Sequence, residues 1–179
     1  MSRWWERSKP DEMVARPWLH PEVTRFLEGL LHPTDRVLEH GSGGSTLWLA
    51  ARVEQVFSIE ADMAWFERIY AMRISNLTLM LWNQPTDPDC LAGTYDLMLI
   101  DGEPVERRAF YIEKASRLVK PGGWVVLDNA NRPEYEEEHV RLRDQAEYSV
   151  TFNVNTPGMT RYLVTEFYKL RGGDHASWE

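Results

Sequence analysis

Apolar positions along the chain follow two spacings, which predict helices alternating with strands. One stretch, 21–31, places apolar side chains three and four positions apart, as on one face of a helix: Val23, Phe26, Leu27, Leu30 and Leu31. Dense apolar runs typical of strands covered on both faces follow at 36–40, 55–60, 76–82, 95–101 and 124–129. Helical patterns separate these runs at 45–53, 61–74 and 104–119. A polar helix is expected at 133–147.

This order predicts an α/β fold with a doubly wound, mostly parallel sheet of seven strands and helices on both faces. Two segments with stricter alternation, 148–154 and 160–170, flank the turn sequence NTPGM and predict a C-terminal antiparallel hairpin. A turn is also expected at KPGG, 120–123. We expect an N-terminal helical or lid segment at 1–34, the sheet domain at 35–170 and a C-terminal tail at 171–179.

Composition and charge narrow the class of protein. The 179 residues are 43% hydrophobic and 27% charged, typical of one soluble domain. A net charge of -8 argues against a broad surface for nucleic acid, and no apolar run approaches the length of a membrane span. The N-terminus shows no signal-peptide core, and the single cysteine, Cys90, fits a reducing compartment, so we expect a cytoplasmic protein.

A glycine-rich stretch, VLEHGSGGST at 37–46, follows the first predicted strand and opens a helix. Gly41 and Gly43 allow a sharp turn and close approach of a ligand to the backbone, and the following helix directs free N–H groups at it. Glu60 ends the next strand 17 residues after Gly43, where a carboxylate accepts two ribose hydroxyls. This pattern predicts a nucleoside cofactor at the strand ends. A plain strand–helix turn with an unrelated glutamate is the alternative.

The residues around the loop separate two cofactor classes. The dinucleotide fingerprint has a third glycine that lets helix and strand pack closely, and Thr46 stands in its place here. Glu39 directly precedes the loop, where its carboxylate would repel a pyrophosphate but suits an ammonium group. Both features favour a cofactor other than a dinucleotide.

Four segments occur in the order found in one enzyme family: VLEHGSGGST, FSIEAD, YDLMLIDG and RLVKPGGWVVLDN. Together, over about 36–170, they resemble the class I S-adenosylmethionine-dependent methyltransferases. The resemblance implies that the loop holds the methionine portion of the cofactor, through Glu39, Gly41, Ser42, Gly43 and Ser45. It implies Glu60 on the ribose, and Ala61 and 82–84 around the adenine. Asn83 stands where the family often has an aspartate.

Oxygen-bearing side chains end two further strands, Asp101 on one and Asp128 with Asn129 on its neighbour. Such ligands suit Mg²⁺, Ca²⁺ or Mn²⁺. LIDG followed by VVLDN resembles the metal-dependent O-methyltransferases of the catechol and caffeoyl-CoA type, which implies Mg²⁺ on these three residues. Alternatively, Asp101 hydrogen-bonds cofactor or loop amides and the Asp128–Asn129 pair starts a turn.

Asp101 is the candidate catalytic residue, beside the cofactor. The metal-dependent group often has a lysine base three residues after this aspartate, and Pro104 occupies that position here, so no general base is assigned. The function expected is methyl transfer from S-adenosylmethionine to a hydroxyl oxygen of a small acceptor. An NAD(P)-dependent oxidoreductase and a non-catalytic S-adenosylmethionine-binding partner are the alternatives.

Several other residues have two interpretations each. The tryptophans before residue 20, Trp4, Trp5 and Trp18, form a lid over the cofactor, or pack in the core or at a homodimer interface. Arg107 and Arg108 bind an anionic substrate or are solvated. His40 takes part in catalysis or braces the glycine turn.

Overall fold

The computed structural model describes residues 14–82, 94–104, 106–154 and 163–172. Its helices are α1 (Pro21–Leu30), α2 (Gly44–Ala50), α3 (Met63–Ala71), α4 (Glu106–Leu118), the short η1 (Pro133–Tyr135) and α5 (Glu136–Gln145). Its strands are β1 (Arg36–His40), β2 (Gln55–Glu60), β3 (Leu77–Leu81), β4 (Tyr95–Ile100), β5 (Val119–Asp128), β6 (Ala146–Val154) and β7 (Leu163–Leu170). No helix within these residues is long and apolar enough to cross a membrane.

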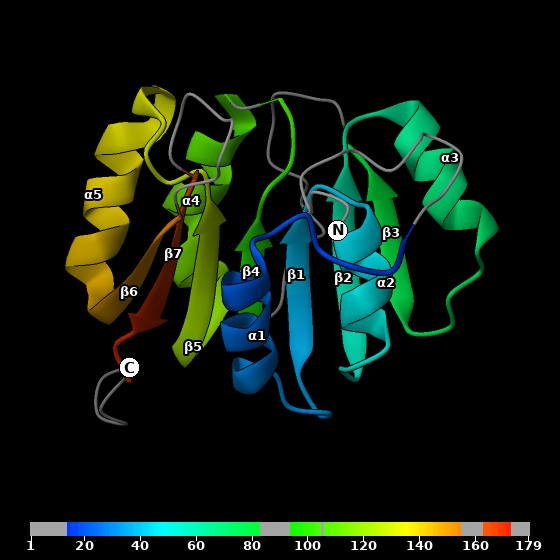
Figure 1. The fold of residues 1–179 in the computed structure, drawn as a ribbon, viewed down its shortest axis with the longest axis horizontal. Coiled ribbons are helices and arrows are strands. Elements are labelled where there is room, and N and C mark those ends of the chain that lie inside the picture. The colour runs from blue at the N-terminus through cyan, green and yellow to red at the C-terminus, as the bar shows by residue number, and fades with distance from the viewer. Residues whose placement is uncertain (1–13, 83–93, 105, 155–162, 173–179) are drawn as a thin grey trace, which may run out of the picture.

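The strands form one seven-stranded sheet in the order β3-β2-β1-β4-β5-β7-β6 (Figure 1). The pairs among β3, β2, β1, β4 and β5 are parallel, whereas β7 pairs antiparallel with both β5 and β6. This confirms the predicted mixed sheet with its C-terminal antiparallel pair. The predicted turn at 155–159 lies outside the described residues.

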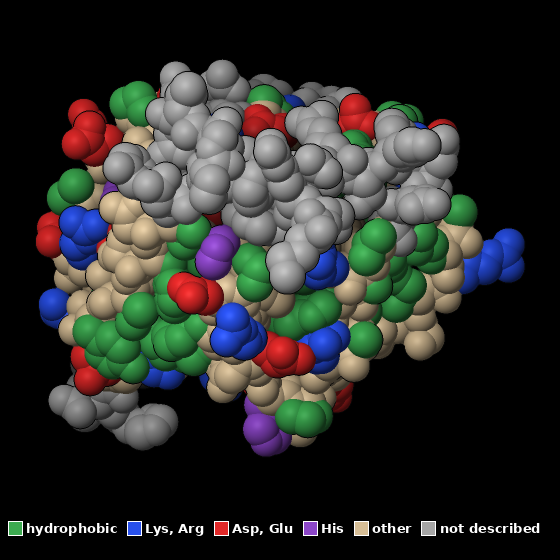
Figure 2. Space-filling view, viewed as in Figure 1, with side chains coloured by type: hydrophobic (Ala, Val, Ile, Leu, Met, Phe, Trp, Pro, Cys, Tyr) green, Lys and Arg blue, Asp and Glu red, His purple; other side chains and the backbone are tan. Residues whose placement is uncertain are grey.

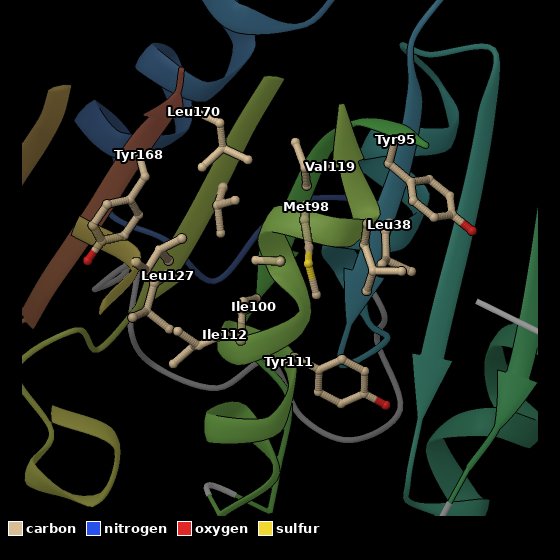
Figure 3. Packing of buried hydrophobic residues seen from close by; sticks show 14 of the residues in the cluster. Leu38, Tyr95, Met98, Ile100, Tyr111, Ile112, Val119, Leu127, Tyr168 and Leu170 are labelled. Carbon is tan, nitrogen blue, oxygen red and sulfur yellow. The ribbon is translucent and has the colours of Figure 1, made fainter. Parts of the chain in front are cut away.

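Two apolar layers cover the sheet, one on each face. On one face α4 and α5 pack on the strands, and Figure 3 shows Tyr111 and Ile112 of α4 against side chains such as Met98 and Leu127. On the other face α1 and α2 pack on β1 and its neighbours, with Val23 and Leu27 of α1 fully buried. The helix predicted within 1–34 therefore contributes to the core of the sheet domain.

The antiparallel end of the sheet is packed by aromatic side chains on the α1 face. Phe26 of α1 lies 4.8 Å from Phe167 and 5.3 Å from Phe152, ring centroid to ring centroid. Trp124 meets Phe26 edge-on and Tyr148, which is half-exposed, packs against Trp124. Hydrophobic side chains gather over this part of the sheet in Figure 2. This packing fixes the position of α1 and of the segment that precedes it.

The sequence KPGG lies inside β5 rather than between a helix and a strand. Tyr95 of β4 pairs with Val119, but Leu97, two residues later, pairs with Trp124. The residues between Val119 and Trp124 therefore bulge out of the ladder, and Gly122 there has φ +75°. α4 ends at Leu118 and β5 begins at the next residue, Val119, so no separate turn lies between them. The predicted turn at KPGG is instead this bulge within β5.

Glu166 of β7 anchors α5 to the sheet. It is 1% exposed, and its carboxylate accepts two hydrogen bonds from Arg143 Nη2, at 3.0 and 2.9 Å, and lies 2.9 Å from His139 Nε2. Burial alone would raise the pKa of Glu166, but the bonds from His139 and Arg143 outweigh it and hold the pKa at about 2.

Glu166→Gln is expected to flatten the loss of stability in acid. The pKa of Glu166 is lower in the fold than the ordinary 4.5, so its contribution is complete above about pH 4.5 and is lost as the pH falls toward 2. That contribution is up to about 3 kcal/mol. Urea unfolding at pH 6 and pH 3 measures it, with Glu137→Gln on the exposed side of α5 as control. Equal acid losses in wild type and Glu166→Gln would contradict this role.

Candidate functional site

The carboxyl ends of β1, β2 and β4 meet at the point where the strand order reverses. β2, the next strand along the chain, lies on one side of β1, and β4 lies on the other side. This arrangement creates a crevice in which ligands bind in such sheets. A cavity of about 540 Å³ lies there. It is lined by seven of the predicted cofactor residues: Gly41, Ser42, Gly43, Ser45, Glu60, Ala61 and Asp101. Their role in binding stays a prediction.

Glu60 ends β2 at the wall of this cavity. Its Oε2 accepts a hydrogen bond from the N–H of Ser42, and its Oε1 accepts from the N–H groups of Ala61 and Asp62, each at 2.8 Å. Burial raises the pKa of Glu60, although these N–H groups oppose the rise. The carboxylate is thereby fixed in orientation, and its remaining lone pairs are available to a ligand in the cavity.

Glu39 lies beneath the loop rather than on the cavity wall. It is fully buried and accepts hydrogen bonds from the hydroxyls of Ser45 at 2.5 Å, Thr46 at 2.6 Å and Ser58 at 2.6 Å. Burial raises its pKa to about 7, against the effect of the three hydroxyls. The sequence predicts Glu39 on the cofactor, and that contact stays a prediction. In the structure its carboxylate holds the first turn of α2.

Thr46 explains how the loop closes without a third glycine. Its hydroxyl accepts a hydrogen bond from the N–H of Gly43 at 2.8 Å and donates to Glu39. The side chain is fully buried, so it fills the space that a dinucleotide fingerprint leaves empty for close packing. In the sequence, this arrangement is indicated by an acidic residue before the glycines and a hydroxyl-bearing residue after them.

Gly41 and Gly102 touch each other at the floor of the cavity. Gly41 has φ +96°, and a Cβ added to it would lie 2.3 Å from the Cα of Gly102. A Cβ on Gly102 would lie 2.7 Å from the N of Gly41. The loops after β1 and β4 therefore approach as closely as backbones can. Sequence reasoning did not single out Gly102, although it follows Asp101 directly.

The segment before α1 crosses the start of α2, as Figure 1 shows. A Cβ on Gly44 would lie 2.3 Å from the carbonyl oxygen of Val14, so this helix start is packed against the crossing segment. Trp18 from that segment and Trp65 from α3 both line the cavity, with ring centroids 6.1 Å apart and planes at 88°. Trp18 thus lies where a lid residue would, whereas Trp4 and Trp5 fall outside the described residues.

Asp101, Asp128 and Asn129 do come together at the ends of β4 and β5, but around the guanidinium of Arg108. Nη2 of Arg108 lies 3.3 Å from Asp101 Oδ1, and its Nη1 lies 3.5 Å from Asn129 Oδ1. Burial and the neighbouring Asp128 carboxylate raise the pKa of Asp101 well above its usual range, while Arg108 opposes the rise. The Arg108 guanidinium already faces the side-chain oxygens of Asp101 and Asn129, and the Asp128 carboxylate accepts a hydrogen bond from Thr165. The three residues therefore do not fit the predicted Mg²⁺ site.

Comparison with solved structures identifies the fold. TomG from Streptomyces achromogenes, an O-methyltransferase in complex with S-adenosylmethionine, superposes with a TM-score of 0.62 at 17% identity, over 86% of this chain and 82% of that one. An rRNA methylase from Streptococcus thermophilus superposes with a TM-score of 0.65 at 14% identity, over 86% of this chain and 99% of that one. The chain has the class I methyltransferase fold.

Another match is named for a different activity. Precorrin 8w decarboxylase from Methanobacterium thermoautotrophicum superposes with a TM-score of 0.62 at 21% identity, over 87% of this chain and 92% of that one. No protein-family model matches the sequence, and no curated protein matches it. At these identities the likeness establishes the architecture, and the chemistry must come from the site itself.

The remaining predicted residues lie at the edge of this site or outside it. His40 is buried with its ring stacked 4.1 Å from that of Tyr111, and burial together with Arg108 lowers its pKa to about 3. A neutral ring in the α4 layer favours the bracing interpretation over catalysis. Arg107 donates to the carbonyl of Trp82. Asn83 and Cys90 fall outside the described residues.

Proposed function

We propose that the protein is an S-adenosylmethionine-dependent methyltransferase acting on a hydroxyl oxygen of a small acceptor. The observation that carries the proposal is the charge of the cavity. Every charged residue that lines it within the described residues is acidic: Glu60, Asp62, Asp101 and Glu103. S-adenosylmethionine carries a sulfonium and an ammonium group, which this lining attracts, whereas a dinucleotide brings a pyrophosphate that it repels.

The rest of the cavity suits the other parts of the same cofactor. Glu60 presents a fixed carboxylate to two ribose hydroxyls, and the glycine loop leaves room for the methionine portion next to the start of α2. Trp65 and Trp18 offer apolar ring surfaces on the same wall as Ala61, where an adenine packs. The cavity thus offers both carboxylates and aromatic rings to a ligand.

The residues of the chain contribute to the reaction by holding the cofactor and the acceptor in place. When bound, S-adenosylmethionine supplies a methyl group activated by its positive sulfur. The acceptor oxygen forms a bond to the methyl carbon as the carbon–sulfur bond breaks and its electron pair returns to sulfur. Asp101, on the cavity wall, would hold the acceptor hydroxyl in line. The proton of that hydroxyl would pass to Asp101 where its carboxylate is ionised, and otherwise to solvent. The choice of a hydroxyl as the methyl acceptor rests on the carboxylate of Asp101, a hydrogen-bond acceptor on the cavity wall.

Calorimetric titration with S-adenosylhomocysteine tests the proposal. We expect a dissociation constant in the micromolar range, about -8 kcal/mol, and quenching of tryptophan fluorescence because Trp18 and Trp65 lie on the cavity wall. In Trp65→Leu the quenching should shrink. NADH, with its pyrophosphate, should bind at least about a hundredfold more weakly. Tighter binding of NADH than of S-adenosylhomocysteine to the folded protein would overturn the proposal.

A further inference from the structure

Arg108 is an arginine whose charge is enclosed almost completely. The residue is 1% exposed although it lies in the first turn of α4, and it does not line the cavity. Buried arginines require acceptors for all five N–H groups. Arg108 has five acceptor atoms within 3.5 Å, which belong to Asp101, Gly102, Asp128 and Asn129.

These acceptors come from two strand ends. Nε donates to the carbonyl of Gly102 at 2.9 Å, and Nη2 donates to the carbonyl of Asp101 at 2.7 Å, both after β4. Nη1 donates to the carbonyl of Asp128 at 2.7 Å, at the end of β5. One planar guanidinium therefore joins the last residues of two neighbouring parallel strands.

One side-chain oxygen of each aspartate at the same place is also hydrogen-bonded. Oδ1 of Asp101 faces Arg108 Nη2 at 3.3 Å, and Oδ1 of Asp128 accepts a hydrogen bond from the hydroxyl of Thr165 at 2.6 Å. A divalent ion needs about six oxygens within roughly 2.0–2.6 Å.

We infer that Arg108 is the resident cation of this site, taking the place at the ends of β4 and β5 where the resemblance to metal-dependent O-methyltransferases implies a divalent metal. Asp101 is then positioned by a guanidinium, and methyl transfer proceeds without metal. This inference deepens the proposed function and rests on it for the role of Asp101.

The substitution has a consequence for the acceptor. A metal ion with open positions grips two neighbouring substrate oxygens, but Arg108 is covered by protein and directs its donors at backbone carbonyls. The acceptor is held instead by a hydrogen bond from one hydroxyl to Asp101. Chelating vicinal hydroxyls are therefore not required, and an acceptor with an isolated hydroxyl should serve as well as a catechol-like one.

The first test is metal binding by the wild-type protein. Mn²⁺ titration followed by electron paramagnetic resonance should show no saturable site at millimolar concentrations, and EDTA should change neither the affinity for S-adenosylhomocysteine nor the melting temperature. A Mn²⁺ site that disappears in Asp128→Asn would overturn the inference. The Mn²⁺ titration and the effect of EDTA on the melting temperature need neither methyl transfer nor S-adenosylhomocysteine, so failure to bind S-adenosylhomocysteine would count against the proposed function alone.

The second test replaces the guanidinium itself. Arg108→Ala leaves buried carbonyls and carboxylates without their cation, so the melting temperature should fall by about 10 °C and be partly restored by millimolar methylguanidine. Arg108→Lys keeps the charge but not the fork, so its kcat should fall at least tenfold with little change in the affinity for S-adenosylhomocysteine. The exposed Arg117→Ala, on the same helix, is the matched control.

Three results would contradict the assignment of Arg108. The first is a kcat of Arg108→Lys equal to that of wild type. The second is a melting temperature of Arg108→Ala that is restored by Mg²⁺ but not by methylguanidine. The third is a melting temperature of Arg108→Ala equal to that of Arg117→Ala. If Arg108→Ala does not fold, Arg108→Lys and the Mn²⁺ titration decide.

Discussion

Replacing Gly41 by alanine is expected to remove a large part of the stability of the protein. The residue has φ +96°, and a Cβ there would lie 2.3 Å from Gly102 Cα and 2.6 Å from Gly102 N. The left-handed backbone costs about 1–3 kcal/mol for a residue with a side chain, and overpacking adds about 1–3 kcal/mol. The total, about 2–6 kcal/mol, is a large part of the 5–15 kcal/mol typical of a domain.

Gly43→Ala provides the matched control for this prediction. Gly43 lies two residues further along the same loop, but its φ of 176° is extended backbone that any residue adopts, and a Cβ would meet nothing within 4 Å. Urea unfolding without ligand should give a loss of less than about 1 kcal/mol for Gly43→Ala. Similar losses in the two variants would show that the contact between the loops after β1 and β4 does not decide stability.

The order of the elements was predictable because it depends on local patterns. Strands buried on both faces give continuous apolar runs such as 95–100, and helices give the spacing of Val23 and Leu27, so the sheet and its covering layers follow from the sequence. The bulge in β5 could not be predicted in the same way. The KPGG sequence signals a turn, but whether the ladder resumes on its far side depends on the pairing of Trp124 with Leu97.

The residues of the candidate site likewise divide into those predictable from local sequence and those that depend on contacts between distant segments. Those in the loop after β1 and at the end of β2 follow from chain order, because carboxyl ends of parallel strands share one edge. Arg108 and Gly102 do not, because their roles arise from contacts between β4, α4 and β5. Glu39 is instructive in another way. Three hydroxyls at 45, 46 and 58 surround its carboxylate, and only the fold brings Ser58 from β2 to β1.

The two glutamates of the site should therefore respond differently to substitution. Glu39→Gln is expected to change stability rather than affinity. Burial raises the pKa of Glu39 to about 7, so the cost of ionising it in the fold grows as the pH rises above 4.5 and is complete above about pH 7. In the glutamine variant the free energy of unfolding should no longer fall over this pH range, a difference from wild type of up to about 3 kcal/mol. Its affinity for S-adenosylhomocysteine should change less than about threefold.

Glu60→Gln is expected to lower the affinity for S-adenosylhomocysteine at least about tenfold, or about 1.4 kcal/mol, with a smaller effect on stability. Glutamine keeps one carbonyl oxygen for the N–H groups of the loop, but it loses the charge and the second acceptor that two ribose hydroxyls need. Calorimetry should show this loss in Glu60→Gln and not in Glu67→Gln, which changes an exposed glutamate of the neighbouring helix α3. Glu60 lines the cavity, whereas Glu39 lies beneath it. If affinity were instead lost in Glu39→Gln and kept in Glu60→Gln, the ligand would have to bind on the other side of the loop.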